Sequence, residues 1–352
     1  MKSVFLLLLT TAIPLALAAQ TTHTVDNDPG AGAQFTSVQN AINAANAGDT
    51  IYIQPSTISY GNVTVNKTIH LRGIAHSPEF NAGNYAILGN ITFDSPIGAP
   101  NSSVSGLRFG RISTNGNQNY SGLSVTNNYI ENYVSVGSSQ SNCSNWYIAG
   151  NVFVTNSSAG AIHKYNTSTS PNWMVVNNHI RQPSTSTNYA AFSRIGVSDI
   201  VRNNVLVFQH NGSNSIVCNQ CSGAKIENSL ILFTGNSTGV NGSGVTFNHS
   251  LIHSYVGQTM TDLPGMNNLN ADPGFVDAAD PTYSVSKDFH IASSSPAYAH
   301  GTDGQQLGIH GNNFQFSKWG YPDDLPYIRS FVAPTVVPIG GFLEVQLEAV
   351  GN

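Results

Sequence analysis

Apolar residues recur along this chain in six-residue blocks that enclose a pair of small polar residues. Each block begins and ends on an apolar residue, with Asn-Asn, Gly-Asn, Asn-Ser or His-Ser in the middle. The blocks lie at 125–130, 148–153, 175–180, 201–206, 226–231 and 247–252, so their last residues are 23, 27, 26, 25 and 21 residues apart. A repeat of this length predicts a solenoid, here an all-β, right-handed parallel β-helix with one block in each three-sided coil.

The apolar ends of the blocks predict two columns of side chains that face the interior. The first column contains Val125, Ile148, Val175, Val201, Ile226 and Phe247, and the second contains Ile130, Phe153, Ile180, Leu206, Ile231 and Ile252. The chain must bend between the two columns. Asparagine suits this bend because it is the non-glycine residue that best tolerates the left-handed backbone region.

The asparagines themselves predict a ladder of stacked side chains. Coils stacked at the strand spacing of ~4.8 Å would set each amide above the next, so that each could donate to its neighbour. The predicted ladder consists of Asn128, Asn151, Asn178 and Asn204, and Ser229 and Ser250 continue it. Surface asparagines that carry glycans or contact a ligand are the alternative, but six blocks in one register favour a structural role.

The remaining patterns predict a third strand in each coil and a distinct structure at each end. Third strands are expected over 133–136, 161–165, 189–192 and 215–218. Apolar residues between Phe35 and Ala45 recur at helical spacing, which predicts an N-terminal helix that caps the first coil. Gly341–Glu348 alternates apolar and polar residues as a half-buried strand does. We therefore expect a leader over 1–19, a capped β-helix over 20–260 and a closing segment over 261–352 that ends in a strand.

The leader has the features of a secretory signal peptide. Lys2 precedes the apolar run Val4–Leu9, and the small residues Ala16–Ala19 follow. Thr10 and Pro14 interrupt the apolar stretch before it reaches the ~20 residues that a membrane-spanning helix needs. The sequence therefore predicts a protein that is secreted or held at the cell surface, without a membrane span.

Composition narrows the range of partners. Charged residues make up only 9% of the chain, against about a quarter in typical domains. Apolar residues make up 40% and recur in order, which argues against disorder. The formal net charge is -5 and no run of Lys and Arg exists to neutralise phosphates, so nucleic acid is excluded as a partner.

Three cysteines are present, Cys143, Cys218 and Cys221. The spacing of Cys218 and Cys221 is shared by zinc and redox motifs, but the second pair that a zinc site needs is missing. Export favours a local disulfide between these two cysteines or two inert thiols.

Three parts of the sequence resemble the pectate-lyase-like superfamily of secreted right-handed β-helix proteins. They are the opening Phe35–Ile51 with Val65–Gly73, the asparagine ladder, and the run that joins Asp272–Phe275, Phe289–Ile291, Ser295–Ala297 and Gly301–Ile309. The last part is similar to the closing segment of bacterial members of unassigned activity. The resemblance covers most of the chain and implies the fold, but the same scaffold hosts lyases, hydrolases, epimerases and non-enzymatic surface proteins.

The chemistry of that superfamily is only partly represented here. Hydrolases need paired carboxylates, whereas residues 101–260 hold only Glu131, Asp199 and Glu227, in different coils. Lyases need a cation beside a base, and calcium-dependent lyases also need a cluster of carboxylates to hold the ion. The sequence shows no such cluster, so calcium is an alternative that the sequence does not support. No other metal or cofactor is indicated. Seven basic residues in this region predict a groove for an acidic polysaccharide, and its candidate catalytic residues are Lys164, Arg181, Arg194, His163 and Tyr165.

Aromatic residues along the coils give a second set of candidates, for sugar binding. These are Trp146, Trp173 and Tyr189, with His210, although the register of the two tryptophans is equally compatible with packing. The sequence therefore predicts an exported β-helix protein that binds polysaccharide, with no catalytic constellation. The alternatives are a lyase that acts on an acidic glycan and a structural or adhesive component that docks a partner protein at its final strand.

Overall fold

The computed structural model describes residues 20–77, 83–137, 141–165, 170–321, 327–332 and 345–350. The predicted leader over 1–19 and the first part of the predicted final strand, 341–344, lie outside the described residues. Within the described residues, no helix is both long enough and apolar enough to cross a membrane.

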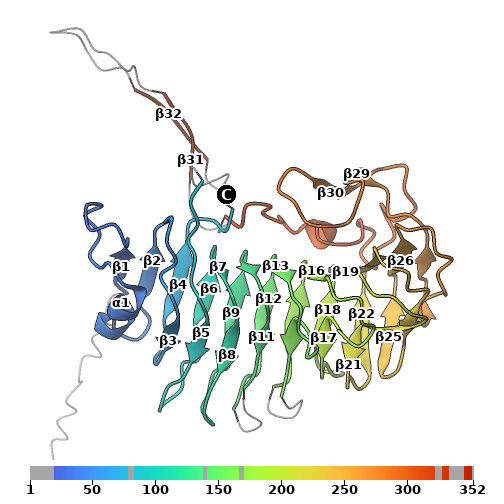
Figure 1. Ribbon diagram of the computed structural model, residues 1–352, viewed down its shortest axis with the longest axis horizontal. Coiled ribbons are helices and arrows are strands. Elements are labelled where there is room, and N and C mark those ends of the chain that lie inside the picture. Colours follow the sequence, from blue (N-terminus) through green and yellow to red (C-terminus); the bar gives the residue numbers. More distant parts are fainter. Residues whose placement is uncertain are drawn as a thin grey trace, which may run out of the picture.

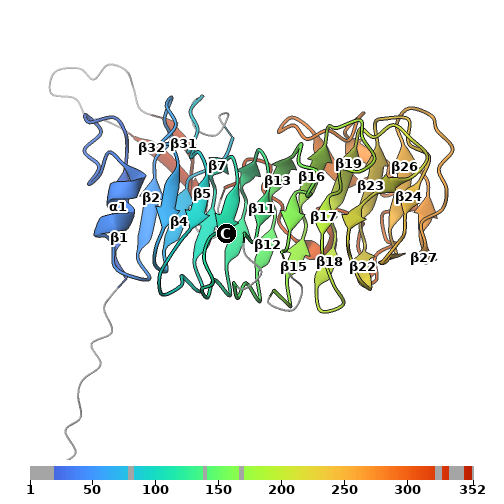
Figure 2. The same cartoon turned by 60° about the horizontal axis from the view of Figure 1, so that its bottom comes forward.

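The chain folds into a parallel β-solenoid with three long sheets, which confirms the predicted fold class (Figure 1). In Figures 1 and 2 the strands lie side by side from α1 at one end to the last coil at the other. The right-handed sense of the coil stays a prediction.

The first sheet has 11 strands and contains the first strand of each repeating block. Its strands are β1 (Thr22–Val25), β2 (Thr50–Ile53), β4 (His70–Gly73), β6 (Ser103–Ser105), β9 (Ser124–Thr126), β12 (Tyr147–Ala149), β15 (Met174–Val176), β18 (Ile200–Arg202), β22 (Ala224–Glu227), β25 (Val245–Asn248) and β27 (Gly265–Met266).

The second sheet has eight strands and the third has seven. The second consists of β7 (Arg108–Phe109), β10 (Tyr129–Ile130), β13 (Val152–Val154), β16 (His179–Gln182), β19 (Val205–Phe208), β23 (Leu230–Phe233), β26 (Leu251–Ser254) and β28 (Leu269–Asn270). The third consists of β3 (Val63–Val65), β5 (Ile91–Phe93), β8 (Ile112–Thr114), β11 (Val134–Ser135), β14 (Ile162–His163), β17 (Phe192–Ser193) and β21 (Cys218–Asn219). A small pair, β20 (Ser215–Ile216) and β24 (Val240–Asn241), lies beside them. The coils thus continue past residue 260, to β28.

The two predicted inward columns are confirmed. Val125, Ile148 and Val175 are paired in register in the first sheet, and Ile130, Phe153 and Ile180 are paired in the second. All six side chains are buried in one continuous core. Alternation along each strand explains this, because only every second side chain can face inward.

The two middle residues of each block have different structural roles. The first residue makes the bend, since Asn127, Asn177 and Asn203 have φ of 56°, 55° and 58°. The second points inward and bonds to the same residue of the next coil. Side-chain amides donate from Asn128 to Asn151, from Asn151 to Asn178 and from Asn178 to Asn204, at 3.0, 3.0 and 3.1 Å.

The N-terminal helix is confirmed as α1 (Val38–Ala44). The hydroxyl of its N-cap residue, Ser37, accepts a hydrogen bond from the Asn40 backbone N–H. Its buried face, Val38, Ala41 and Ile42, packs on the core of the first coils. The helix therefore covers the apolar interior that an open first coil would expose to water.

A C-terminal segment, residues 271–321, covers the outer face of the second sheet (Figure 1). This face is apolar, and its outward residues Val207, Leu230 and Leu232 pack against Phe289 and Ile309 of the segment. The segment contains the antiparallel pair β29 (Phe275–Asp277) and β30 (Asp288–Ile291) and a 3-10 turn, η1 (Gly311–Asn313). The segment therefore adds a second apolar core outside the coils.

The same segment bonds to the row of bend residues. The Asn177 amide donates to the carbonyl oxygens of Ile309 and Gly311, both at 3.0 Å. The Gly308 N–H donates to the Asn228 carbonyl oxygen at 2.9 Å, and Thr302 also bonds to Asn228. The bend residues thus turn the chain within each coil and also hydrogen-bond to the C-terminal segment that covers the second sheet.

The end of the chain forms an antiparallel pair, β31 (Tyr327–Val332) and β32 (Gln346–Val350). In Figure 1 this pair projects beyond the stacked coils. Of the two open outcomes for the cysteines, the structure shows the disulfide between Cys218 and Cys221 and a buried free thiol at Cys143.

Candidate functional site

The expected exposure of Lys164 is wrong, because this side chain lies inside the coil. Lys164 is 0% exposed, and its ammonium lies 2.6 Å from both carboxylate oxygens of Asp199. The same carboxylate accepts the backbone N–H groups of Trp173 and Gly196 at 2.8 Å. Lys164 and Asp199 therefore form a fully engaged internal ion pair, and Lys164 is not available to a polymer in solution.

The two tryptophans proposed as sugar contacts are also internal. Trp146 and Trp173 are 0% exposed, and their rings stack in parallel at 4.5 Å. Their indole N–H groups donate to the carbonyl oxygens of Tyr120 and Cys143 at 2.7 and 2.6 Å. Their equal register in neighbouring coils thus reflects packing, and neither ring can reach a ligand.

The predicted basic groove is not assembled. Arg181 lies on β16 of the second sheet, whereas Lys164 and Arg194 follow strands of the third sheet. Three of the candidates do come together at the surface. One Arg194 guanidinium nitrogen lies 3.3 Å from the His163 ring, and the guanidinium lies 5.8 Å from the centre of the Tyr165 ring.

The last two binding candidates lie in one loop region but differ in exposure. Tyr189 is half-buried, whereas His210 is 0% exposed and packs on Phe208 at 4.8 Å between ring centres. Burial lowers the pKa of His210 to about 4. His210 is therefore a neutral core residue and not a surface contact, contrary to the expectation.

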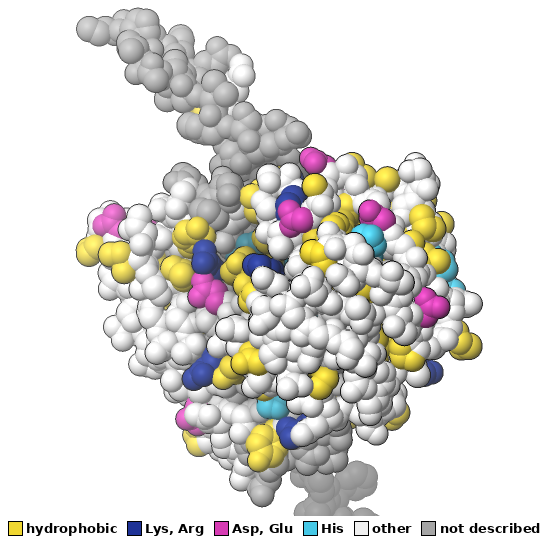
Figure 3. All heavy atoms as spheres, turned by 45° about the vertical axis from the view of Figure 1, so that its right-hand side comes forward, with side chains coloured by type: hydrophobic (Ala, Val, Ile, Leu, Met, Phe, Trp, Pro, Cys, Tyr) yellow, Lys and Arg dark blue, Asp and Glu magenta, His cyan; other side chains and the backbone are white. Residues whose placement is uncertain are grey.

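The surface shown in Figure 3 carries few charges, and those are scattered among neutral polar atoms. One pocket is hollowed into the C-terminal segment, between β30 and residues 310–321, with a volume of about 530 Å³. Aromatic, charged and amide side chains line it together. The lining residues are Asp277, Ser286, Lys287, Asp288, Phe289, His290, His310, Gln315, Phe316, Ser317, Lys318, Trp319 and Tyr321.

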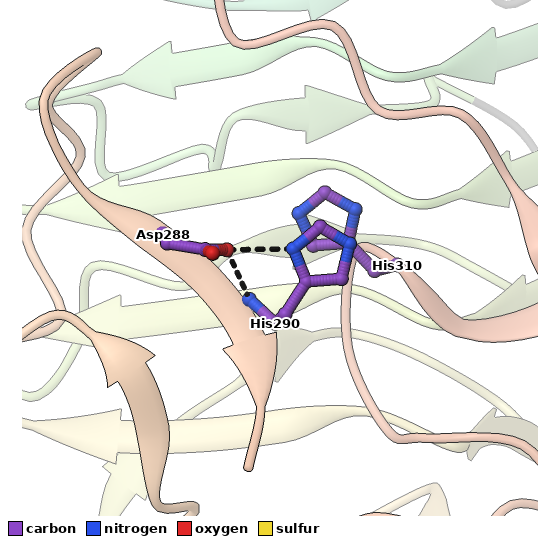
Figure 4. A group of neighbouring side chains, drawn as sticks. All are labelled: Asp288, His290 and His310. Carbon is purple, nitrogen blue, oxygen red and sulfur yellow. Dashed lines mark hydrogen bonds and ion pairs between the residues drawn. The ribbon is translucent and has the colours of Figure 1, made fainter.

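One wall of the pocket holds a carboxylate and two imidazoles (Figure 4). Asp288 Oδ1 lies 2.6 Å from His290 Nδ1 and also accepts the His290 backbone N–H at 3.0 Å. The ring of His310 stacks on that of His290, with 3.7 Å between centres. One ligand atom from each of the three residues falls within 4.8 Å of the other two.

The surroundings set the charge of this group. Burial lowers the pKa of His310 to about 4, and the neighbouring His290 acts in the same direction. Burial acts to raise the pKa of Asp288, but hydrogen bonds from His290 outweigh it and hold the pKa below its ordinary value. Near neutral pH the wall therefore presents an ionised carboxylate beside a neutral imidazole.

No known family model matches this chain. No curated protein matches it either. The resemblance to the pectate-lyase-like superfamily therefore stays a prediction beyond the shared β-solenoid fold.

The sequence did not point to the pocket, because its residues come from 277–290 and 310–321 without any repeat. A weak signal was present in Asp288-Phe289-His290. Alternation along a strand places the first and third of such residues on one face, so a carboxylate and an imidazole become neighbours. Nothing in the sequence indicated that His310 would join them.

Proposed function

We propose that this protein is exported and binds carbohydrate in the pocket of the C-terminal segment. The observation that carries the proposal is the composition of the pocket wall around Trp319. Trp319 is 37% exposed and stands beside carboxylate, amide and hydroxyl groups. Sugars present both apolar C–H faces and hydroxyls, so an exposed ring beside such groups suits them.

The size of the pocket supports a short stretch of glycan. A volume of about 530 Å³ is within the usual range for small-ligand sites. Lys287 and Lys318 line the pocket with Asp277 and Asp288, so the wall carries both signs of charge. The pocket therefore suits a neutral sugar or a sugar with a single carboxylate better than a densely anionic polymer.

The test is binding of soluble glycans by isothermal titration calorimetry across a panel of neutral and acidic oligosaccharides. Trp319→Ala should weaken the binding about tenfold, since loss of a stacking ring costs about 1.4 kcal/mol. Tyr298→Ala is the matched control, because Tyr298 is 46% exposed but does not line the pocket. Absence of binding across the panel, or equal effects of the two changes, would refute this site.

Export is tested separately. Intact-mass measurement of the protein from culture medium or from the cell surface should show a chain that begins near residue 20. A full-length chain retained inside the producing cell would contradict export. The sugar site would still be tested independently by the calorimetric titration.

A lyase remains a second candidate because of the surface group His163, Tyr165 and Arg194. Tyr165 is 49% exposed and the Arg194 guanidinium lies near its ring, so a cation and a phenol meet where a uronate could bind. In β-elimination the Arg194 cation would neutralise the sugar carboxylate, the Tyr165 oxygen would take the proton beside it, and the bond to the glycosidic oxygen would break to leave a C=C bond. The departing oxygen would take up a proton from the Tyr165 hydroxyl or from water. Release of ultraviolet-absorbing unsaturated products from alginate or pectate, lost in Arg194→Ala, would support it, and silence on all acidic glycans would remove it.

A further inference from the structure

Strand alternation brings Asp288 and His290 to the same side of β30. Phe289 and Ile291, 4% and 2% exposed, point from this strand into the core against the second sheet. Asp288 and His290 point the opposite way and line the pocket. Both residues are therefore presented on a strand whose other face is anchored.

His310 reaches the same place from a different part of the segment, and Gln306 ties the two parts together. The Gln306 side chain accepts the Ile291 backbone N–H at 2.7 Å and donates to the His310 carbonyl oxygen at 3.4 Å. The His310 ring also meets Phe316 edge-on at 5.8 Å. Within the described residues, neither ring nitrogen of His310 has a recorded hydrogen bond, so its lone pair is available to a ligand.

We propose that Asp288, His290 and His310 bind one divalent transition-metal ion of the zinc class at the wall of the pocket. Two imidazole nitrogens and one carboxylate oxygen suit zinc and its neighbours, whereas calcium and magnesium prefer oxygen ligands alone. Three protein ligands leave the fourth tetrahedral position open. In this site that position faces the pocket, so it is filled by water or by an oxygen of a bound molecule.

Metal binding needs only a local change in geometry. Zinc bonds of about 2.0–2.1 Å set tetrahedral ligand atoms roughly 3.3 Å apart. His290 Nδ1 and Asp288 Oδ1 now lie 2.6 Å apart around a shared proton. When the ion binds at Nδ1, the proton there moves to Nε2, so the ring is the other neutral tautomer and Nδ1 offers its lone pair to the metal. The His290 side chain is 52% exposed, so it can turn until its lone pair converges with that of His310.

The experiment titrates the purified mature protein, without a histidine tag, with zinc chloride by calorimetry and with cobalt chloride by visible absorption. We expect one ion per chain and the intense visible bands of low-coordinate cobalt. His310→Ala should weaken zinc binding by at least roughly 100-fold, because one of three ligands is lost. His290→Gln should do the same, and since His290 is half-exposed, this variant is expected to fold normally, which circular dichroism checks.

His253→Ala is the matched control, because His253 and Asp272 form another His–carboxylate pair, with 3.8 Å between Nε2 and Oδ2. This change should leave zinc binding as it is in the unaltered protein, and calcium chloride should give no response. No zinc heat and no cobalt band, or zinc binding that survives His290→Gln unchanged, would overturn the proposal. No glycan is present in these titrations, so their failure and that of the carbohydrate proposal are distinguishable.

Discussion

Replacement of Asn178 by alanine should destabilise the coils strongly. The side chain is 0% exposed, and its amide donates to the carbonyl oxygens of Ile148 and Val176 at 2.9 and 3.0 Å and to Asn204 at 3.1 Å. Its own oxygen accepts both the backbone N–H and the amide of Asn151, each at 3.0 Å. A single residue therefore satisfies polar groups in three successive coils.

The magnitude follows from the groups left behind. In Asn178→Ala the Asn151 backbone N–H loses its recorded partner, and the carbonyl oxygens of Ile148 and Val176 each lose a donor. The Asn151 amide keeps one bond, to the Val125 carbonyl oxygen at 2.8 Å. The unsatisfied Asn151 N–H costs about 1 to 3 kcal/mol, and each of the two lost bonds to a carbonyl oxygen costs about 1 kcal/mol, so we expect a total loss of about 3 to 5 kcal/mol.

The assay is urea unfolding of the mature protein, followed by circular dichroism. Asn188→Ala is the control, because Asn188 is exposed and its recorded hydrogen bond uses the backbone N–H, which alanine keeps. The control should stay within about 0.5 kcal/mol of the unaltered protein. A loss below about 1 kcal/mol for Asn178→Ala would refute the reasoning, because a buried amide with these partners cannot be removed so cheaply.

Two further predictions concern buried ionisable side chains. Lys164→Ala should destabilise the fold by about 3 to 5 kcal/mol, because it leaves the buried Asp199 carboxylate without its cation. The double variant Lys164→Met with Asp199→Asn should recover much of this loss in the same urea assay. A double variant that loses as much free energy of unfolding as Lys164→Ala would contradict the prediction. Burial lowers the pKa of His179 from 6.5 to about 4, so the unfolded chain binds a proton first as the pH falls. The free energy of unfolding should therefore drop by about 3 kcal/mol between pH 6.5 and 4 from this group alone, and His179→Gln should lack that drop in urea titrations at each pH.

The structural reason for the last prediction is the position of His179 beneath the C-terminal segment. Its Nε2–H donates to the Pro281 carbonyl oxygen at 2.8 Å, and Nδ1 is buried without a partner within the described residues. A second proton on Nδ1 would have no acceptor, so acid should loosen this contact between coil and segment. A variant with an unchanged pH profile would show that His179 is not kept neutral by burial.

The sequence alone determined the coil and its register. The six blocks repeat closely enough that the columns ending in Phe247 and Ile252, the bend residues and the capping helix α1 could all be placed before the fold was known. The physical reason is that every coil must bury one face of each strand, and each strand does so by placing every second residue inward. An error in the register predicted for one coil is not carried to the next, because each block indicates the register independently.

Features outside that repeat, such as the Lys164–Asp199 ion pair and the cover over the second sheet, became apparent only in the tertiary structure. The chain enters the third sheet after loops of variable length, so the sequence could not show that Lys164 falls at an inward position and meets Asp199. One signal was missed. The strands Val205–Phe208 and Leu230–Phe233 are apolar at every position, as strands buried on both faces are, and this pattern predicts a cover over the second sheet. That cover is the C-terminal segment, and His310 meets Asp288 and His290 only because the segment folds back along the sheet, a contact that no local pattern encodes.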